Sequence, residues 1–297
     1  DIFFFIQDID IANFADDNTP YGTDKILDNL LNTLENETKT LLDWFRINEM
    51  KPNEDKCHLL VINNADNTSV KVGNETLMGQ KTVDLLGIKI DNELKFTEHV
   101  TKLCKKGNQK LHALARISNY LDQEKLKILM KTFITSQFNY CPLIWMFHNR
   151  TLNNKINRLH ERALRMVYKK ENLSFEELLE LDNSVTIHHR NLQKLATEMY
   201  KIKNGLSPKP VKELFNECNT NYNLRNKRCW ETSNARTVIY GTETISFRGP
   251  KIWEILPQEL KESRTLEEFK YKVKSWKPNE CDCRLCKTFI PNLGFID

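Results

Sequence analysis

Residues 13–21 read NFADDNTPY and place two adjacent carboxylates, Asp16 and Asp17, beside apolar sequence and before turn-forming residues. The flanking pattern predicts a short strand, a tight turn that carries both aspartates, and a return strand ending near Tyr21. Adjacent side chains of a regular strand point to opposite faces, so consecutive aspartates can serve one site only where a turn redirects them. We therefore expect a β-hairpin that gathers negative charge at its turn.

A long helix and further strands follow this hairpin. Apolar residues recur at helical spacing from Thr23 to Phe45, which predicts about six turns of amphipathic helix. Three short β-rich stretches bounded by Asn, Asp or Gly come next, at Cys57–Asn63, Ser69–Val72 and Leu85–Ile90. This order predicts an α+β fold in which the helix covers one face of an antiparallel sheet.

The chain becomes mostly helical after residue 96. Thr97 is expected to cap a first helix, a second begins near Asp122 with Phe133 on its buried side, and a third runs from Thr151. The aromatic stretch Phe138–Phe147 contains a proline, which predicts a packed junction between helices. Capping-box patterns predict two later helix starts, at Ser174 with Glu177 and at Thr265 with Glu268.

The formal net charge of +4 conceals an asymmetry along the chain. Residues 1–94 carry 8 Lys and Arg against 18 Asp and Glu, a net charge of −10. Residues 95–170 carry 16 against 4, a net charge of +12. Such a basic segment predicts a surface that faces a polyanion, beside an acidic segment that repels the same polyanion unless metal ions intervene. The alternative is a pair of solvated surfaces that balance each other.

The sequence carries no signal for a membrane or for secretion. No apolar run approaches the roughly 18 residues that a membrane span needs, and the opening DIFFFI lacks the basic flank and the length of a signal peptide. Eight cysteines without a secretory context predict reduced thiols. We expect no membrane partner and a cytoplasmic and nuclear location. Because the chain opens on Asp and enters an apolar run at once, we also expect that an N-terminal part of a larger protein precedes it.

Paired carboxylates at a turn suit Mg²⁺, which keeps several waters and is typically held by one or two carboxylates plus substrate phosphates. Two such ions about 3.5–4 Å apart can activate an attacking oxygen and stabilise the leaving oxygen in phosphoryl transfer. An exposed Asp-Asp turn that binds no metal is the alternative. The dipeptide alone favours this alternative.

Six segments carry a family resemblance by their order and spacing. FADD (residues 14–17), NEMKPNEDKCHLLVI (48–62) and LLGIKIDNELKFTEHV (85–100) resemble the palm and thumb of reverse transcriptases of LINE-type, jockey-like non-LTR retrotransposons. The tail that follows the polymerase in some of these elements resembles YNLR (222–225), FRGPKIWEILP (247–257) and CDCRLCKTFI (281–290). The resemblance implies a partial palm over residues 1–95, a helical basic thumb over 96–170, and a mixed helical C-terminal region with a Cys-rich end over 171–297.

The resemblance implies an RNA-directed DNA polymerase that performs two-metal nucleotidyl transfer with Mg²⁺ or Mn²⁺. Asp16 and Asp17 would be the catalytic metal ligands, and Lys56 would lie near the phosphates of the incoming deoxynucleoside triphosphate. The hairpin that grips the end of the primer would contain Leu86, Gly87 and Ile88. The RNA template and the DNA primer or target would contact Lys102, Lys105, Lys106, Lys110, Lys155, Arg158, Arg162 and Arg165.

The same resemblance predicts that the catalytic site is incomplete. In the family a third catalytic aspartate and the nucleotide-binding fingers precede the FADD hairpin by many tens of residues, whereas thirteen residues precede Phe14 here. The fingers, the first part of the palm and any endonuclease domain would lie outside this chain. Without one of its three carboxylates, a two-metal centre lacks ligand charge where phosphate repulsion is greatest. We expect no measurable polymerase activity from this chain alone.

Three cysteines near the C-terminus form a C-x-C-x₂-C pattern of soft ligands at chelating distance: Cys281, Cys283 and Cys286. A structural zinc site needs four ligands, and no histidine follows His189. Either Cys218 or Cys229 could complete the set from a distance, or the thiols are free, and we expect no bound zinc. His188 and His189 are expected on a helix face without catalytic duty, because helix neighbours diverge by ~100°.

Two classes of function remain open. The chain is the back half of a reverse transcriptase that in its complete form copies its own RNA at nicked target DNA, or it is a non-catalytic RNA- or DNA-binding remnant of a retrotransposon protein. An open reading frame that extends upstream through the fingers and a further catalytic aspartate would favour the enzyme. An unrelated Mg²⁺-dependent hydrolase that uses the same aspartate pair is a third reading, which predicts turnover without a primer.

Overall fold

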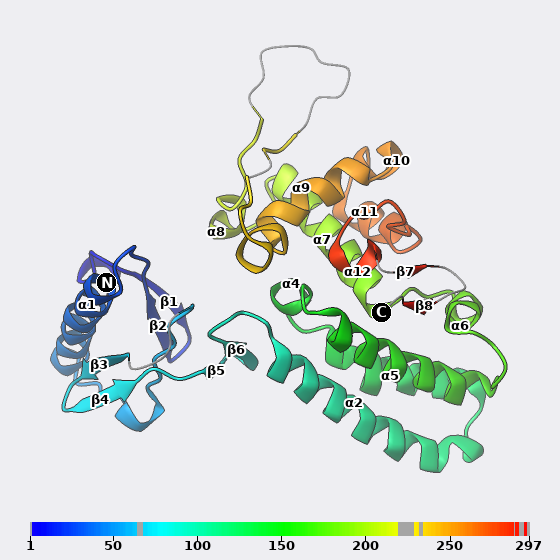
Figure 1. Ribbon diagram of the computed structural model, residues 1–297, viewed down its shortest axis with the longest axis horizontal. Coiled ribbons are helices and arrows are strands. Elements are labelled where there is room, and N and C mark those ends of the chain that lie inside the picture. Colours follow the sequence, from blue (N-terminus) through cyan, green and yellow to red (C-terminus); the bar gives the residue numbers. More distant parts are fainter. Residues whose placement is uncertain are drawn as a thin grey trace. The chain divides into compact units, whose positions relative to one another are not determined.

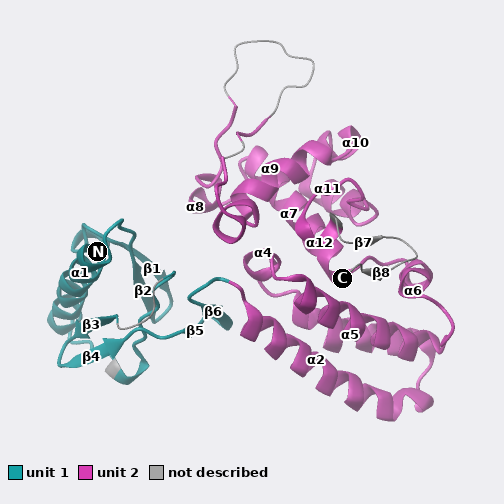
Figure 2. Ribbon diagram, viewed as in Figure 1, with its two compact units in different colours: residues 1–94 teal, residues 95–297 magenta. Residues whose placement is uncertain are grey.

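The computed structural model describes residues 2–63, 68–218, 229–231, 234–287, 289–290 and 294–295, and the fold is α+β (Figure 1). The chain divides into two compact units, unit 1 over residues 1–94 and unit 2 over residues 95–297 (Figure 2). Residues 96–170 and 171–297, expected as thumb and C-terminal region, fall together in unit 2. Their identities as polymerase domains stay predictions.

Unit 1 begins with a 3₁₀ turn, η1 (Ile2–Phe4), and the predicted hairpin. Strands β1 (Asp10–Phe14) and β2 (Asp17–Tyr21) pair antiparallel, with Phe14 opposite Asp17. Ala15 and Asp16 form the two-residue turn, and Ala15 has a positive φ of 54°. The predicted strand, turn and return strand are therefore confirmed, with Asp17 as the first residue of the return strand.

The predicted long helix is confirmed as α1 (Leu27–Ile47), which begins a few residues later than expected. One part of its apolar face packs with Ile2 and Ile6. Another part packs with Val70 and Val72 of β3 (Ser69–Val72). The helix therefore joins two small clusters of unit 1 because its apolar stripe runs the length of the helix.

The predicted single sheet is wrong. The strands that the structure describes in unit 1 form three separate antiparallel pairs: β1 with β2, β3 with β4 (Glu75–Met78), and β5 (Thr82–Leu85) with β6 (Ile88–Asp91). The stretch Leu85–Ile90 is not one strand, because the chain reverses at Leu86 and Gly87, which have φ of 47° and 83°. Cys57–Asn63 is not a strand either, and contributes one isolated bridge between Leu59 and Gly79.

Helices α2 (Thr97–Ile117) and α5 (Arg150–Tyr168) pack side by side in unit 2 (Figure 1). The two helices approach closely at Gly107, where an added Cβ would lie 2.5 Å from Cδ2 of Leu159. Thr97 is the first helical residue and makes no side-chain cap, since Phe96 holds the N-cap position at a positive φ of 53°. The predicted cap at Thr97 is therefore wrong.

In the sequence, η3 (Ser118–Tyr120) and α3 (Gln123–Leu129) follow α2. As expected, Asp122 caps α3, and its side chain accepts a hydrogen bond from the N–H of Lys125. The chain then forms a π-helical turn, η4 (Met130–Ile134), followed by η5 (Thr135–Phe138). A π turn inserts one extra residue per turn, so Ile134 is buried and Phe133 is 48% exposed. The expected burial of Phe133 is wrong for this reason.

The aromatic junction is confirmed. Cys141 has a positive φ of 39°, Pro142 starts the short helix α4 (Pro142–Trp145), and Trp145 and Met146 are fully buried. Proline at the first helical position costs no hydrogen bond there. The backbone reversal and the proline together end one helical path and start another.

The remainder of unit 2 is mostly helical and packs around a core cluster that includes Met199, Trp253 and Phe269. The elements are α6 (Phe175–Asp182), α7 (Ile187–Lys203), α8 (Lys209–Lys212), η6 (Val238–Thr242), α9 (Ile245–Ile255), α10 (Gln258–Lys261), α11 (Leu266–Val273), α12 (Arg284–Lys287), β7 (Phe289–Ile290) and β8 (Gly294–Phe295). Tyr200 of α7 stacks on Phe269 of α11, with ring centroids 4.4 Å apart. Helix α7 thus forms the centre of the unit's C-terminal half, packing against α9 and α11.

Both expected helix caps are present at their serine and threonine. Ser174 and Glu177 form a full capping box. Thr265 accepts from the N–H of Glu268, but the Glu268 carboxylate accepts from the N–H of Arg264. In a full capping box the carboxylate would accept from the N–H of Thr265, so this half of the second box is shifted by one residue, to Arg264. In the part of the chain that the structure describes, no helix combines the length and apolar character needed to cross a bilayer.

Candidate functional site

The FADD turn presents two exposed carboxylates. Asp16 lies in the β1–β2 turn, and its main-chain oxygen accepts a hydrogen bond from the Asn18 side chain at 3.2 Å. Asp17 is the exposed first residue of β2. Among the described residues, no third His, Cys, Asp or Glu joins these two in a cluster of potential metal ligands. The pair can supply oxygen ligands to a divalent cation, but it does not enclose one.

Lys56 is the last residue of a 3₁₀ turn, η2 (Glu54–Lys56), and its side chain is exposed. Its main-chain N–H donates to the Asn53 oxygen at 3.1 Å. No described ion pair connects Lys56 with Asp16 or Asp17. The structure therefore gives Lys56 a solvent-facing ammonium in the same unit as the aspartates, without a direct contact to them.

The residues expected to grip the primer form the β5–β6 turn. Leu86 and Gly87 are both exposed and both have positive φ, as the type I′ turn of a two-residue hairpin requires. Ile88 is only 3% exposed and belongs to the packed face of the hairpin. An ion pair of 3.4 Å between Lys89 and Asp84 spans the two strands. Leu86 and Gly87 are thus placed to touch a ligand, whereas Ile88 supports the hairpin.

The basic residues expected to bind nucleic acid lie on α2 and α5. On α5 they recur at positions i, i+3, i+7 and i+10, which places them on one stripe of the helix: Lys155, Arg158, Arg162 and Arg165. On α2 three are exposed and Lys110 is half-buried, the exposed ones being Lys102, Lys105 and Lys106. Arg162 donates to the Asn108 side-chain oxygen of α2 at 2.9 Å, so the stripe reaches the seam between the helices.

Two of these basic side chains have structural duties. Arg165 pairs with Glu161 at 2.6 Å and also donates to the main-chain oxygen of Lys170 at 3.3 Å, which holds the end of α5. Lys155 lies near the buried Cys104, where its charge partly opposes the burial that raises the pKa of the Cys104 thiol to about 11. Lys105, Lys106, Lys155 and Arg158 have exposed side chains.

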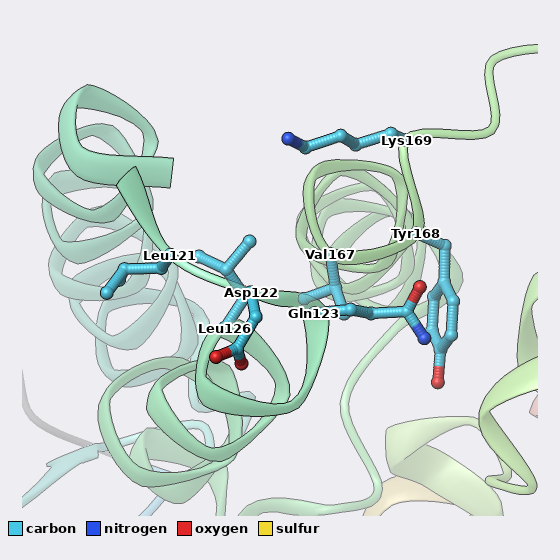
Figure 3. A pocket seen from close by; sticks show the side chains of 7 residues that line it. All are labelled: Leu121, Asp122, Gln123, Leu126, Val167, Tyr168 and Lys169. Atoms are coloured by element: carbon cyan, nitrogen blue, oxygen red, sulfur yellow. The ribbon is translucent and has the colours of Figure 1, made fainter. Parts of the chain in front are cut away.

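A buried carboxylate links three helices elsewhere in unit 2. Asp182 accepts from Lys127 Nζ at 2.8 Å and from the Tyr168 hydroxyl at 2.7 Å. Burial raises the pKa of Asp182, but the hydrogen bonds from Lys127 and Tyr168 outweigh it, and the pKa is lowered. Tyr168 also lines a pocket of about 220 Å³ with Asp122, Lys169 and other residues of α3 and α5 (Figure 3). None of the residues expected to act in catalysis lines this pocket.

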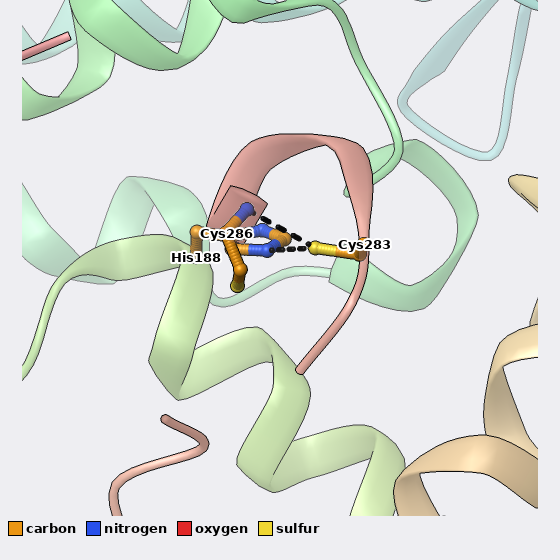
Figure 4. Close-up of side chains that lie close together, drawn as sticks. All are labelled: His188, Cys283 and Cys286. Atoms are coloured by element: carbon orange, nitrogen blue, oxygen red, sulfur yellow. Dashed lines mark hydrogen bonds between the residues drawn. The ribbon is translucent and has the colours of Figure 1, made fainter. Parts of the chain in front are cut away.

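A compact group of His and Cys side chains lies where α7 meets the C-terminal segment. Ligand atoms of His188, Cys283 and Cys286 all lie within 4.8 Å of one another. His188 Nε2 is 3.2 Å from Cys283 Sγ, and the main-chain N–H of Cys286 donates to the same sulfur at 3.4 Å (Figure 4). His188 and Cys283 are 5% and 1% exposed. A His/Cys/Cys group of this kind can hold a soft or borderline metal ion.

The thiols of this group interact strongly with one another. Hydrogen bonds from Cys283 and Cys286 lower the pKa of Cys281, and the positive charge of Arg248 adds to the effect. For Cys283, the hydrogen bond with Cys281 raises the pKa, but the bonds with Cys286 and His188 outweigh it and lower the pKa. For Cys286, hydrogen bonds with both neighbours and burial raise the pKa. Cys281 is not among the ligand atoms that lie within 4.8 Å of one another.

Sequence reasoning missed His188 as a partner of the cysteines. The expectation considered only histidines that follow His189 in the sequence. In the fold, α7 places His188, which is 95 positions before Cys283, against the Cys283 sulfur. The signal in the sequence was the histidine pair His188–His189 at the start of α7. Thr186 caps this helix by accepting a hydrogen bond from the N–H of His189. Neither Cys218 nor Cys229 belongs to the described group. The segment YNLR lies outside the described residues, and FRGPKIWEILP forms most of α9 and its C-terminal end.

Comparison with protein-family models, curated proteins and solved structures finds no match.

Proposed function

We propose that the chain is part of an RNA-directed DNA polymerase of a non-LTR retrotransposon. The observation that supports this most directly is the β1–β2 hairpin, which carries FADD at its turn with Asp16 and Asp17 both exposed. Exposed oxygen ligands on a short, rigid turn can meet metal ions that are shared with substrate phosphates. In this proposal the two aspartates bind Mg²⁺ or Mn²⁺ in two-metal nucleotidyl transfer.

The other elements take roles that fit their exposure. Lys56 neutralises the phosphates of the incoming deoxynucleoside triphosphate, and the β5–β6 turn at Leu86 and Gly87 contacts the end of the primer. The exposed lysines and arginines of α2 and α5 bind the phosphate backbone of the RNA template and the DNA primer. The catalytic centre in this proposal needs a third carboxylate, and among the described residues none lies with the aspartate pair.

A second candidate function is nucleic-acid binding without catalysis. The stripe on α5 and the lysines of α2 favour it, because a cationic helix pair binds a phosphate backbone through counterion release without any metal. This candidate makes the aspartate turn a solvated hairpin and predicts that the RNA–DNA duplex binds with no defined position relative to Asp16.

Binding of the chain to an RNA–DNA primer–template at several salt concentrations tests the part that both candidates share. The variant K105Q/K106Q/R158Q removes three charges from the proposed surface, and K212Q/K270Q/K274Q removes three exposed charges elsewhere in unit 2. Each phosphate contact contributes roughly 0.7–0.9 to the slope of log K against log salt. Loss of three contacts in the first variant should therefore reduce the magnitude of this slope by about 2–3. Equal losses of slope in both variants would argue against a defined surface on α2 and α5.

Iron-mediated cleavage separates the polymerase from the simple binder. Fe²⁺ with ascorbate and peroxide, replacing Mg²⁺ at the aspartate pair, should cut the bound primer close to its 3′ end in the chain as it stands. D16N/D17N should abolish the local cuts and leave the binding affinity unchanged within error. Tight binding with cuts spread evenly along the duplex would favour the non-catalytic candidate. Primer extension by this chain alone would contradict the expected need for a third carboxylate.

A further inference from the structure

We propose that His188, Cys281, Cys283 and Cys286 bind one zinc ion that fastens the C-terminal segment to α7. The site is independent of the aspartate hairpin and of nucleic-acid binding. It draws its ligands from two segments about ninety residues apart, the first turn of α7 and the segment that contains α12. The ion would have a structural role, since four protein ligands leave no open position for a substrate.

The distances fit a tetrahedral zinc site. Zinc bonds of about 2.3 Å to sulfur and about 2.0–2.1 Å to nitrogen place neighbouring ligand atoms about 3.5–3.8 Å apart. His188 Nε2 and Cys283 Sγ are 3.2 Å apart, and the His188, Cys283 and Cys286 ligand atoms fall within 4.8 Å of one another. We assign Cys281, two residues before Cys283 and 8% exposed, as the fourth ligand. Its sulfur is outside the set of atoms that lie within 4.8 Å of one another, so its side chain must move toward the ion when the ion binds.

The burial of these groups argues for an ion. Cys281 and Cys283 are 8% and 1% exposed, and His188 is 5% exposed. Removing an imidazole and thiols from water carries a desolvation cost, because thiols are weak hydrogen-bond partners. A metal ion bound by His188 Nε2 and the sulfurs offsets this cost.

The surrounding charges fit an anionic zinc–thiolate centre. Three thiolates and Zn²⁺ carry a net charge of −1, and the Arg248 guanidinium pairs with Asp282, the residue between Cys281 and Cys283. Arg248 is 6% exposed and is held by Glu243 at 2.7 Å and Asp282 at 2.8 Å. The N–H of Cys286 donates to Cys283 Sγ, a contact that stabilises a thiolate. These interactions around the ligands tune and orient them.

The choice of zinc follows from the ligand set. A ligand set of three sulfurs and one nitrogen suits Zn²⁺, whereas Mg²⁺ and Ca²⁺ require oxygen ligands. The carboxylate of Asp282, between two of the cysteines, is occupied by Arg248 and by Lys251 at 3.1 Å. It therefore stays outside the ligand set. This site is distinct from the proposed Mg²⁺ or Mn²⁺ site in unit 1 in both ligand chemistry and location in the sequence.

Metal analysis of the full chain, purified under reducing conditions without chelator, tests the proposal. We expect one zinc ion per chain by plasma mass spectrometry after gel filtration. H188Q and C283S should lose it, while the exposed controls H112Q and C229S should retain it. Less than a tenth of an equivalent after incubation with excess zinc, or full retention by both H188Q and C283S, would overturn the site. One equivalent of iron in place of zinc would overturn the assignment of the metal.

A second measurement covers variants that fail to fold. Cobalt(II) bound to the wild-type chain should give intense tetrahedral visible bands and a sulfur-to-cobalt charge-transfer band whose intensity indicates three thiolates. C281S should retain cobalt with the charge-transfer intensity of two thiolates, because it removes one of four ligands. A weak octahedral spectrum for the wild type, or an unchanged charge-transfer band in C281S, would contradict the four-ligand set.

Discussion

Replacing Lys127 with methionine is expected to destabilise the chain more than replacing its ion-pair partner Asp182 with asparagine. The two side chains meet at 2.8 Å, and Tyr168 donates to the same carboxylate oxygen at 2.7 Å. Their burial is unequal, since the Asp182 side chain is 1% exposed and the Lys127 side chain is 31% exposed. The two variants therefore leave very different groups without a partner.

The loss of unfolding free energy in each variant depends on the group that is left without its partner. K127M leaves a fully buried carboxylate with the Tyr168 hydroxyl as its main donor, and breaking a buried pair in this way costs about 3–5 kcal/mol. D182N leaves an ammonium that still reaches water and donates to the Asp182 main-chain oxygen at 3.2 Å in the native structure. Its cost should be that of a weakened charged hydrogen bond, about 1.5–3 kcal/mol.

The pH dependence gives the sign that tests the mechanism. In the wild type the pKa of Asp182 is lowered, so the carboxylate stabilises the fold above its unfolded pKa, and this contribution is lost as pH falls through the lower folded pKa. In K127M, burial without the ammonium should raise the pKa of Asp182. The folded variant then binds a proton that the unfolded chain does not, so its deficit in stability should shrink from pH 7 to pH 5.

Urea denaturation followed by circular dichroism and tryptophan fluorescence at pH 7 and pH 5 measures both effects. K125M is the matched control, because Lys125 lies on the same helix and pairs with Asp122 in an ion pair that is more than half exposed on both sides. It should leave stability unchanged at both pH values. The reasoning is refuted if K127M costs no more than K125M, or if its deficit is the same at pH 5 and pH 7.

Three further substitutions test local features, each by thermal unfolding. Gly107→Ala should lower the stability by about 1–3 kcal/mol, because the added Cβ would overlap Leu159. The double variant with Leu159→Ala should lose less stability than the sum of the two single changes. Additive losses would show that the helices do not touch there. Ser174→Ala should cost about 1 kcal/mol by removing the cap of α6, and no loss would contradict that cap. Ala15→Gly should stabilise the hairpin by about 1 kcal/mol, since Ala15 holds a positive φ, whereas a destabilised hairpin would argue against that turn.

Local signals were sufficient for the first hairpin, α1, the proline junction and the serine cap. Each depends on residues within one or two turns of each other, such as the apolar period of α1 or the Ser174 and Glu177 pair. Such patterns encode their structure without help from distant sequence. The exposed position of the FADD aspartates follows from the same local pattern, because a two-residue turn leaves both ends of the reversal in solvent.

The errors have local physical causes as well. LLGIKI is rich in strand-forming residues, yet Leu86 adopts a positive φ that is usually marked by Asn or Asp before Gly, so the turn inside it carried no clear marker. Residues 57–63 bury Leu59 and Val61 as a strand would, but they find only one bridge partner. Apolar content reports burial, and it does not report backbone pairing.

The proposed zinc site would add to the ion pairs that Asp282 makes with Arg248 and Lys251 in holding the segment around α12. Helix α12 has four residues, too short to be stable on its own, and the segment around it buries chiefly Cys281, Cys283 and Leu285. Holding it against His188 closes a loop of about ninety residues, whose entropic cost grows with the logarithm of its length. Metal–ligand bonds between distant residues would offset part of that cost, in addition to the buried side chains and the ion pairs of Asp282. Sequence spacing recognises such a site only when all its ligands fall in one window, and here the fourth ligand is supplied by the fold.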